Sequence, residues 1–233
     1  MEATSAALSL RLLTPRTLLR LATGRTGRVF AVRSLGLAAL FGFEITLARA
    51  LGVGGYGIFS FALTLAIIAS RLSPIGWLNA STRLVSAYVS MGQYGHLKGC
   101  LILAYATTAV GLAIALPVLA AIGSTSPAVG SMVMLGILAM AVTLAMLEVH
   151  RHILRGLHAG DFGEALLILL LPALAMLAVW ALRIADATTA AYIYALVGAG
   201  LVLLSSVAIV RRLPLAVWKA KAEFRTRTWL LMA

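Results

Sequence analysis

Six long apolar stretches constrain this chain more than any other feature of its sequence. Each is about 20 residues long, the length at which a helix rising about 1.5 Å per residue crosses roughly 30 Å of hydrocarbon. We therefore expect an all-α polytopic membrane protein, built as a bundle of six transmembrane helices. The stretches cover residues 29–48, 56–76, 100–122, 129–149, 165–182 and 190–210.

The composition excludes an ordinary soluble domain. Hydrophobic residues make up 62% of the 233 residues and charged residues 11%, whereas soluble domains have about 45–50% apolar and 25% charged residues. A chain of this length has too much surface to hide several unbroken apolar stretches in a core. The net charge of +12 does not indicate nucleic-acid binding, because the basic residues lie between the apolar stretches and not on one folded face.

The positions of the basic residues predict how the chain is oriented. Short cytoplasmic loops retain Lys and Arg, whereas short translocated loops do not. With the amino terminus inside, sixteen of the 19 basic residues fall on the cytoplasmic side. Only Arg49 and Arg183 then lie outside, and Arg33 lies within a span. We therefore expect a multi-pass protein with a cytoplasmic amino terminus.

Three regions follow from this pattern. Residues 1–28 form a basic cytoplasmic leader that is partly an amphipathic helix, although their arginine-rich composition also fits an organelle transit peptide. Residues 29–210 form the six-helix transmembrane bundle, and residues 211–233 form a basic cytoplasmic linker. Because Trp229 to Met232 open a new apolar run, we expect a further span and a longer protein.

Some small residues have structural interpretations. Gly52, Gly54, Gly55 and Gly57 lack the lysine of a phosphate-binding loop and predict a tight outer turn between two spans. Cys100 is the only cysteine and lies in an apolar stretch, so we expect it to pack in the interior. It leaves no disulfide framework or cysteine metal site.

A cluster of ionisable residues closes the fourth stretch. Glu148 and His152 would share one helical face at a spacing of four, with His150 between them. A metal site would need a third ligand, and the HExxH spacing is absent. We therefore expect a solvated cytoplasmic helix end, with no metal ion or other cofactor.

Charges inside the first span are the strongest site candidates. A charge at the bilayer centre costs about 2.5–3.5 kcal/mol and usually faces a bundle interior or a watery cavity. Arg33 and Glu44 are close to three helical turns apart and share a stripe with Leu37 and Leu40, but an axial offset of about 16 Å forbids direct contact. They either line one cavity at two depths or reach to the inner and outer interfaces.

The segment after the second span supplies another candidate. Residues 79–98 predict a helical connector on the cytoplasmic surface, with Leu84 and Tyr88 on one face. Arg83 lies where a cationic side chain could meet an anionic head group that enters from the cytoplasm. Arg71 is a weaker candidate of the same kind, and for both the alternative is an ordinary positive-inside anchor.

Three segments resemble a known family when taken in order. The stretch of residues 47–59, LARALGVGGYGIF, is similar to the R-x-L-G-x-x-x-Y/F-G-x-F stretch that joins the first two spans of bacterial polysaccharide flippases. Residues 76–99, with Arg83 and Gly92, resemble the connector after the family's second span, and residues 154–157 resemble the segment before its fifth. These flippases belong to the multidrug/oligosaccharidyl-lipid/polysaccharide exporter superfamily.

The resemblance implies a fold and a task. Family members have two six-helix bundles around a central cavity, so this chain would be the first bundle and its partners would include the carboxyl-terminal bundle and membrane lipids. The substrate would be a polyprenyl-pyrophosphate-linked oligosaccharide, moved across the bacterial inner membrane by alternating access for polysaccharides such as O-antigen or exopolysaccharide. Arg33, Arg49 and Arg83 occupy positions that could meet the anionic carrier. No enzymatic activity is implied.

Two other functions compete with this one. A cation-coupled small-molecule exporter of the same superfamily would want intramembrane carboxylates, for which only Glu44 and Glu148 qualify. A membrane-embedded glycan polymerase or ligase would want a large outward loop with catalytic residues. The predicted outer loops are too short for that.

Overall fold

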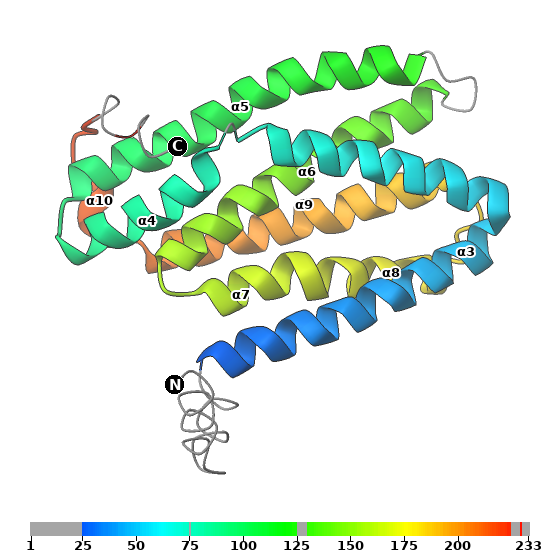
Figure 1. Cartoon of the computed structure of the whole chain (residues 1–233), viewed down its shortest axis with the longest axis horizontal. Helices are drawn as coiled ribbons and strands as arrows, with labels where there is room; N and C mark the ends of the chain where they lie inside the picture. The colour runs from blue at the N-terminus through cyan, green and yellow to red at the C-terminus, as the bar shows by residue number, and fades with distance from the viewer. Residues whose placement is uncertain (1–24, 75, 125–129, 225–228, 230–233) are drawn as a thin grey trace, which may run out of the picture.

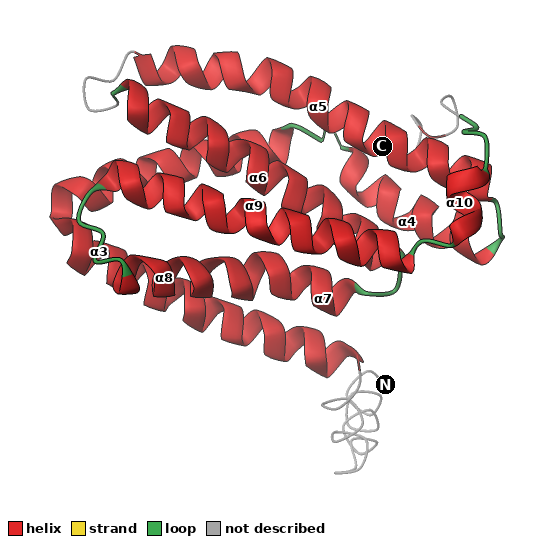
Figure 2. Ribbon diagram, turned by 180° about the vertical axis from the view of Figure 1, so that it is seen from behind, coloured by secondary structure: helices red, strands yellow, loops and turns green. Residues whose placement is uncertain are grey.

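The computed structural model describes residues 25–74, 76–124, 130–224 and 229. That part of the chain is a bundle of long helices without a strand (Figure 1, Figure 2), so the predicted all-α class is confirmed. In chain order the elements are α3 (Arg25–Leu72), α4 (Trp77–Ser90), α5 (Tyr94–Ser124), α6 (Ser131–Gly156), α7 (Gly160–Glu164), the π-helix η1 (Ala165–Leu170), α8 (Leu171–Ala181), α9 (Ala187–Arg212) and α10 (Leu215–Lys219).

Five helices in the described part are long and apolar enough to cross a membrane. They are α3, α5, α6, the continuous helix formed by α7, η1 and α8, and α9. The sequence predicts six spans, and the difference lies in α3, which joins the first two predicted spans into one helix of 48 residues.

Helix α3 reverses direction at Gly52. This residue has φ 67° and ψ 178°, a conformation that glycine alone adopts at little cost. In Figure 1 the blue arm and the cyan arm of α3 run in opposite directions from this point. The tight turn predicted over the four glycines is therefore confirmed at Gly52, and the helix resumes directly after it.

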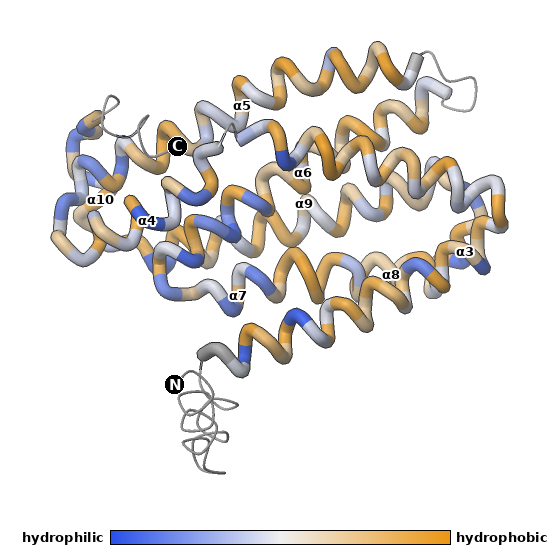
Figure 3. Tube along the Cα trace, in the orientation of Figure 1, coloured by the Kyte–Doolittle hydropathy of each residue, from blue (hydrophilic) through white to orange (hydrophobic). Residues whose placement is uncertain are grey.

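Figure 1 gives the bundle two distinct ends. We call the end with α4, the start of α7 and α10 the α4 end, and the opposite end, where α3 reverses and α8 connects to α9, the Gly52 end. In Figure 3 the hydrophilic positions gather mainly at the α4 end, and the middle of the bundle is apolar. The loop charges predict that this end faces the cytoplasm.

An aromatic cluster holds the two arms of α3 against α9. The ring of Phe43 lies 5.9 Å from that of Phe59 in an edge-to-face arrangement and 5.6 Å from that of Tyr194. Both phenylalanines are almost fully buried. Apolar burial and aromatic geometry therefore fix the angle between the arms.

A π-helical turn lies where α3 crosses the fifth predicted span. Pro172 has no N–H to donate to the carbonyl of Ile168, and the chain widens into the π-helix η1 just before it. Gly36 of α3 packs on this turn, where a Cβ would lie 2.8 Å from the Ile168 oxygen. The glycine therefore permits a close approach of the two backbones.

The connector and the tail meet at the α4 end. Helix α4 buries Leu84 and Tyr88 on one face, as predicted. Lys98 donates to the carbonyls of Trp218 and Ala220 at 3.1 and 3.0 Å, so α10 lies against α5. Trp229 is buried and donates to the Tyr88 hydroxyl at 2.7 Å.

The outer limits of the predicted regions are only partly described. Residues 1–24 of the predicted leader lie outside the described residues, and its last residues belong to α3. The apolar run that predicts a further span also lies outside the described residues, except for the buried Trp229. Cys100 is buried as predicted.

Candidate functional site

Glu148 of α6 is a carboxylate buried within the bundle near its α4 end. Only 2% of its side chain is exposed, and two arginines pair with it. Arg71 of α3 lies 3.0 Å from one carboxylate oxygen, and Arg151 of α6 lies 2.6 Å from the other. A buried carboxylate is strongly disfavoured without such partners, so these ion pairs offset the cost of burying Glu148.

Glu164, at the end of α7, is the second buried carboxylate. Arg155 donates a short hydrogen bond to it, Arg33 lies 3.4 Å away, and Arg151 lies 3.8 Å away. Arg151 therefore joins the two carboxylates into one network, which draws on α3, α6 and α7. At its edge Arg28 pairs with Asp161 at 3.7 Å.

The network carries more positive than negative charge. Five arginines face three carboxylates, with Arg28, Arg33, Arg71, Arg151 and Arg155 on one side and Asp161, Glu148 and Glu164 on the other. Because the cations outnumber the anions, the network can accept a further anion.

Local sequence explains why the charges meet. Glu148, Arg151 and Arg155 follow one another at spacings of three and four, which places them on one face of α6. The packed helix α7 has glycine where it touches α6, since a Cβ on Gly163 would lie 3.2 Å from the Arg151 backbone. This close approach brings Glu164 next to Arg151 and Arg155.

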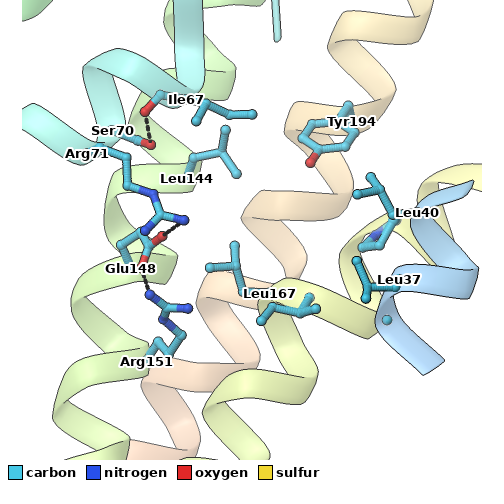
Figure 4. A pocket seen from close by; sticks show the side chains of 13 residues that line it. Leu37, Leu40, Ile67, Ser70, Arg71, Leu144, Glu148, Arg151, Leu167 and Tyr194 are labelled. Atoms are coloured by element: carbon cyan, nitrogen blue, oxygen red, sulfur yellow. Dashed lines mark hydrogen bonds and ion pairs between the residues drawn. The ribbon is translucent and has the colours of Figure 1, made fainter. Parts of the chain in front are cut away.

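A cavity of about 230 Å³ adjoins the network. Figure 4 shows Arg71, Glu148 and Arg151 at one end of it, and Leu37, Leu40 and Tyr194 at the other. It can therefore hold a group with an anionic and an apolar part. The complete lining is Gly36, Leu37, Leu40, Ile67, Ser70, Arg71, Leu144, Glu148, Arg151, Leu167, Ile168, Pro172 and Tyr194.

Arg33 and Glu44 do not share a site. The Arg33 side chain is 56% exposed and pairs with the buried Glu164. Glu44 accepts a hydrogen bond of 2.6 Å from Tyr56, which lies on the other arm of α3. Leu37 and Leu40, which lie between them in the predicted stripe, line the cavity.

Arg49 and Arg83 lie apart from the network. Arg49 is near the reversal of α3 and lines a second pocket at the Gly52 end together with Arg183. Arg83 is exposed on α4 and makes no ion pair or hydrogen bond with the residues that the structure describes. Of Arg33, Glu44, Arg49 and Arg83, only Arg33 joins the ion network. The weaker candidate Arg71 joins it as well.

The prediction of a solvated helix end around Glu148 is wrong. Glu148, His150 and His152 are all buried, because α6 continues to Gly156 against its neighbours. Nδ1 of His150 lies 2.6 Å from the Ser205 hydroxyl, and Nδ1 of His152 lies 3.0 Å from the Thr82 hydroxyl. The three residues therefore have separate partners. Across the described ranges, no group of three or more His, Cys, Asp or Glu is placed to hold a metal ion.

Sequence reasoning missed most of the network. The spacing of Glu148, Arg151 and Arg155 was a signal that a helix would place the three on one face. Glu164 had no comparable signal, since it lies on a different helix from Arg155, and its other partner Arg33 is 131 residues away. No protein family, curated protein or solved structure matches this chain.

Proposed function

We propose that this chain moves a polyprenyl-pyrophosphate-linked oligosaccharide across the bacterial inner membrane by alternating access. In this proposal the two arms of α3 cross separately, which gives six crossings with a cytoplasmic amino terminus. The observation that carries the proposal is the arginine-rich network beside a cavity in an otherwise apolar bundle.

The chemistry of the substrate favours such a network. A pyrophosphate cannot leave water unless charged donors replace its hydration. Arginine provides five N–H donors in a planar fork that matches phosphate oxygens. Arg71 is 57% exposed and faces the cavity while it pairs with Glu148, so part of its guanidinium remains available to an incoming anion.

The buried carboxylates have a supporting role. Glu148 and Glu164 hold several arginines close together, which without an anion would repel one another. An arriving pyrophosphate would add acceptors beside these fixed donors. Because the arginines are already held in place before the anion arrives, the cavity can bind it with little rearrangement.

The exposed charges on α3 support a second bundle. Arg33 and Arg71 both have more than half of their side chain exposed, at positions within long apolar helices. Charges at this depth face a protein interior or water and avoid lipid. We include in the proposal a carboxyl-terminal bundle that covers this face and encloses a polar path.

The cation-coupled exporter is less favoured. It needs a carboxylate free to bind a proton or a metal cation. Glu148 and Glu164 already face arginines, and Glu44 accepts a hydrogen bond from Tyr56. The site therefore suits an anion better than a cation.

The test replaces Arg71 in cells whose only flippase gene encodes this chain. Arg71→Ala should sharply reduce surface polysaccharide, with lipid-linked oligosaccharide accumulating on the cytoplasmic leaflet. Arg71→Lys should retain part of the output, because the charge remains without the planar fork. Immunoblots check that protein abundance is unchanged.

Arg211→Ala is the matched control, since Arg211 is an exposed arginine in the last turn of α9. Its polysaccharide output should equal that of the unmodified protein. If Arg71→Ala also supports normal output, the network does not handle the substrate and the proposed function fails.

A further inference from the structure

A second pocket lies at the Gly52 end of the bundle, away from the ion network. It has a volume of about 400 Å³. Its two charged lining residues, Arg49 and Arg183, are the two basic residues that the loop pattern places on the outer side. The complete lining is Thr46, Arg49, Ala50, Val179, Trp180, Arg183, Ile184 and Ala185.

The two arginines have no counter-charge among the described residues. Neither guanidinium makes an ion pair or a hydrogen bond there, and the lining contains no acidic residue. The neighbouring carboxylates are occupied, because Asp186 accepts a hydrogen bond from the Thr189 N–H at 2.8 Å and Glu44 accepts one from a tyrosine. Two cations in one pocket repel each other unless an anion joins them.

The backbone at Arg183 supports a role for its side chain. The residue has φ 51°, in the left-handed region. It follows α8, where Ile184 N–H donates to the Val179 carbonyl at 3.2 Å and Arg183 N–H donates to the Trp180 carbonyl at 3.4 Å. Glycine is the usual residue at this position of such a helix end. A side chain in this conformation is uncommon, and this helix end sets the direction in which the Arg183 side chain leaves the backbone.

The remaining lining suits a membrane surface. Trp180 is 74% exposed beside the arginines, and tryptophan favours the level of lipid head groups because its ring is apolar and its N–H is polar. Val179 and Ile184 are buried at the pocket wall. The pocket therefore combines two guanidinium groups with a tryptophan suited to the membrane interface and an apolar wall.

We propose that this pocket binds the phosphate of an anionic glycerophospholipid in the leaflet at the Gly52 end. Arg49 and Arg183 bind the phosphate oxygens, and Trp180 lies beside the glycerol. This assigns Arg49 to a bound lipid, in place of the role in the central cavity that the family resemblance implies. The inference does not depend on which substrate the bundle transports.

Native mass spectrometry of the purified full chain with phosphatidylglycerol tests the proposal. Two variants remove one charge each, Arg49→Gln and Arg183→Gly, and glycine suits the left-handed backbone of position 183. Each variant should bind phosphatidylglycerol about tenfold more weakly than the unmodified chain, because one charge-assisted contact is lost. Arg211→Gln, an exposed arginine on α9, should leave binding unchanged.

The other arms separate lipid from free phosphate. Zwitterionic phosphatidylcholine should bind more weakly than phosphatidylglycerol to the unmodified chain, and this preference should shrink in both variants. Unchanged phosphatidylglycerol binding by both variants, which circular dichroism shows to be folded, would overturn the proposal. Displacement of the lipid by an equal concentration of inorganic phosphate would overturn the lipid assignment as well.

Discussion

Removing the negative charge of the buried Glu148 should strongly destabilise the bundle. Glu148→Gln leaves the shape of the side chain nearly unchanged but removes the anion that lies 2.6 Å from Arg151 and 3.0 Å from Arg71. Arg151 is only 11% exposed, so water cannot replace the lost partner. Arg71 is 57% exposed and contributes little to the loss.

The expected magnitude follows from this difference in exposure. Breaking one partner of a buried ion pair costs about 3–5 kcal/mol. Arg151 keeps a weaker contact with Glu164 at 3.8 Å, which places the expected loss near the lower limit, at about 3 kcal/mol. Removing both charges in Glu148→Gln/Arg151→Gln should recover part of this loss, because no buried cation is then left unpaired.

The assay is reversible unfolding in mixed micelles with increasing detergent denaturant, followed by circular dichroism. Glu223→Gln is the control, since Glu223 is 61% exposed and pairs with His96 at 3.3 Å, and it should change the free energy of unfolding by less than about 1 kcal/mol. If Glu148→Gln lowered the free energy of unfolding no more than the control does, the network would not be desolvated as described.

Substitutions at Gly36 test a contact between two helices, and substitutions at Asp186 test a helix cap. Gly36→Ala should destabilise the protein by about 1–3 kcal/mol in the same unfolding assay, because the added Cβ would meet the Ile168 backbone. In the control Gly54→Ala the added Cβ enters open space, so this variant should be neutral or stabilising. The Thr189 N–H lowers the pKa of Asp186, so this cap stabilises the protein above about pH 4 and loses its effect as the pH falls through the lowered pKa. Asp186→Ala should cost about 1 kcal/mol at pH 7, with the gap closing in acid, and Asp186→Asn should keep the cap without that pH dependence. Equal behaviour of Gly36→Ala and Gly54→Ala, or a gap for Asp186→Ala that persists in acid, would contradict these interpretations.

Hydropathy predicted the helical class and the approximate position of each apolar helix. It failed where a helix continues through polar residues, as α6 does from Val149 to Gly156. A polar residue looks the same in a sequence whether it meets water or a buried partner. At Gly52 the predicted tight turn is present, and the chain reverses at this single glycine.

The candidate site was predictable in part. Arg33 was identifiable because a charge within an apolar stretch must find a polar partner. The identity of that partner depends on how α3 packs on α7, which no local pattern encodes. Arg49 and Arg183 were grouped by the loop count as outer residues, but their common pocket required the fold.

The reversal of α3 has a mechanical consequence. A loop of several residues would let the first two helical arms rock independently, because many dihedral angles could share the movement. Here a single glycine connects them, so few backbone dihedral angles can change without moving both arms. If the arm that carries Arg33 tilts, either the two dihedral angles of Gly52 change or the arm that carries Arg71 tilts with it.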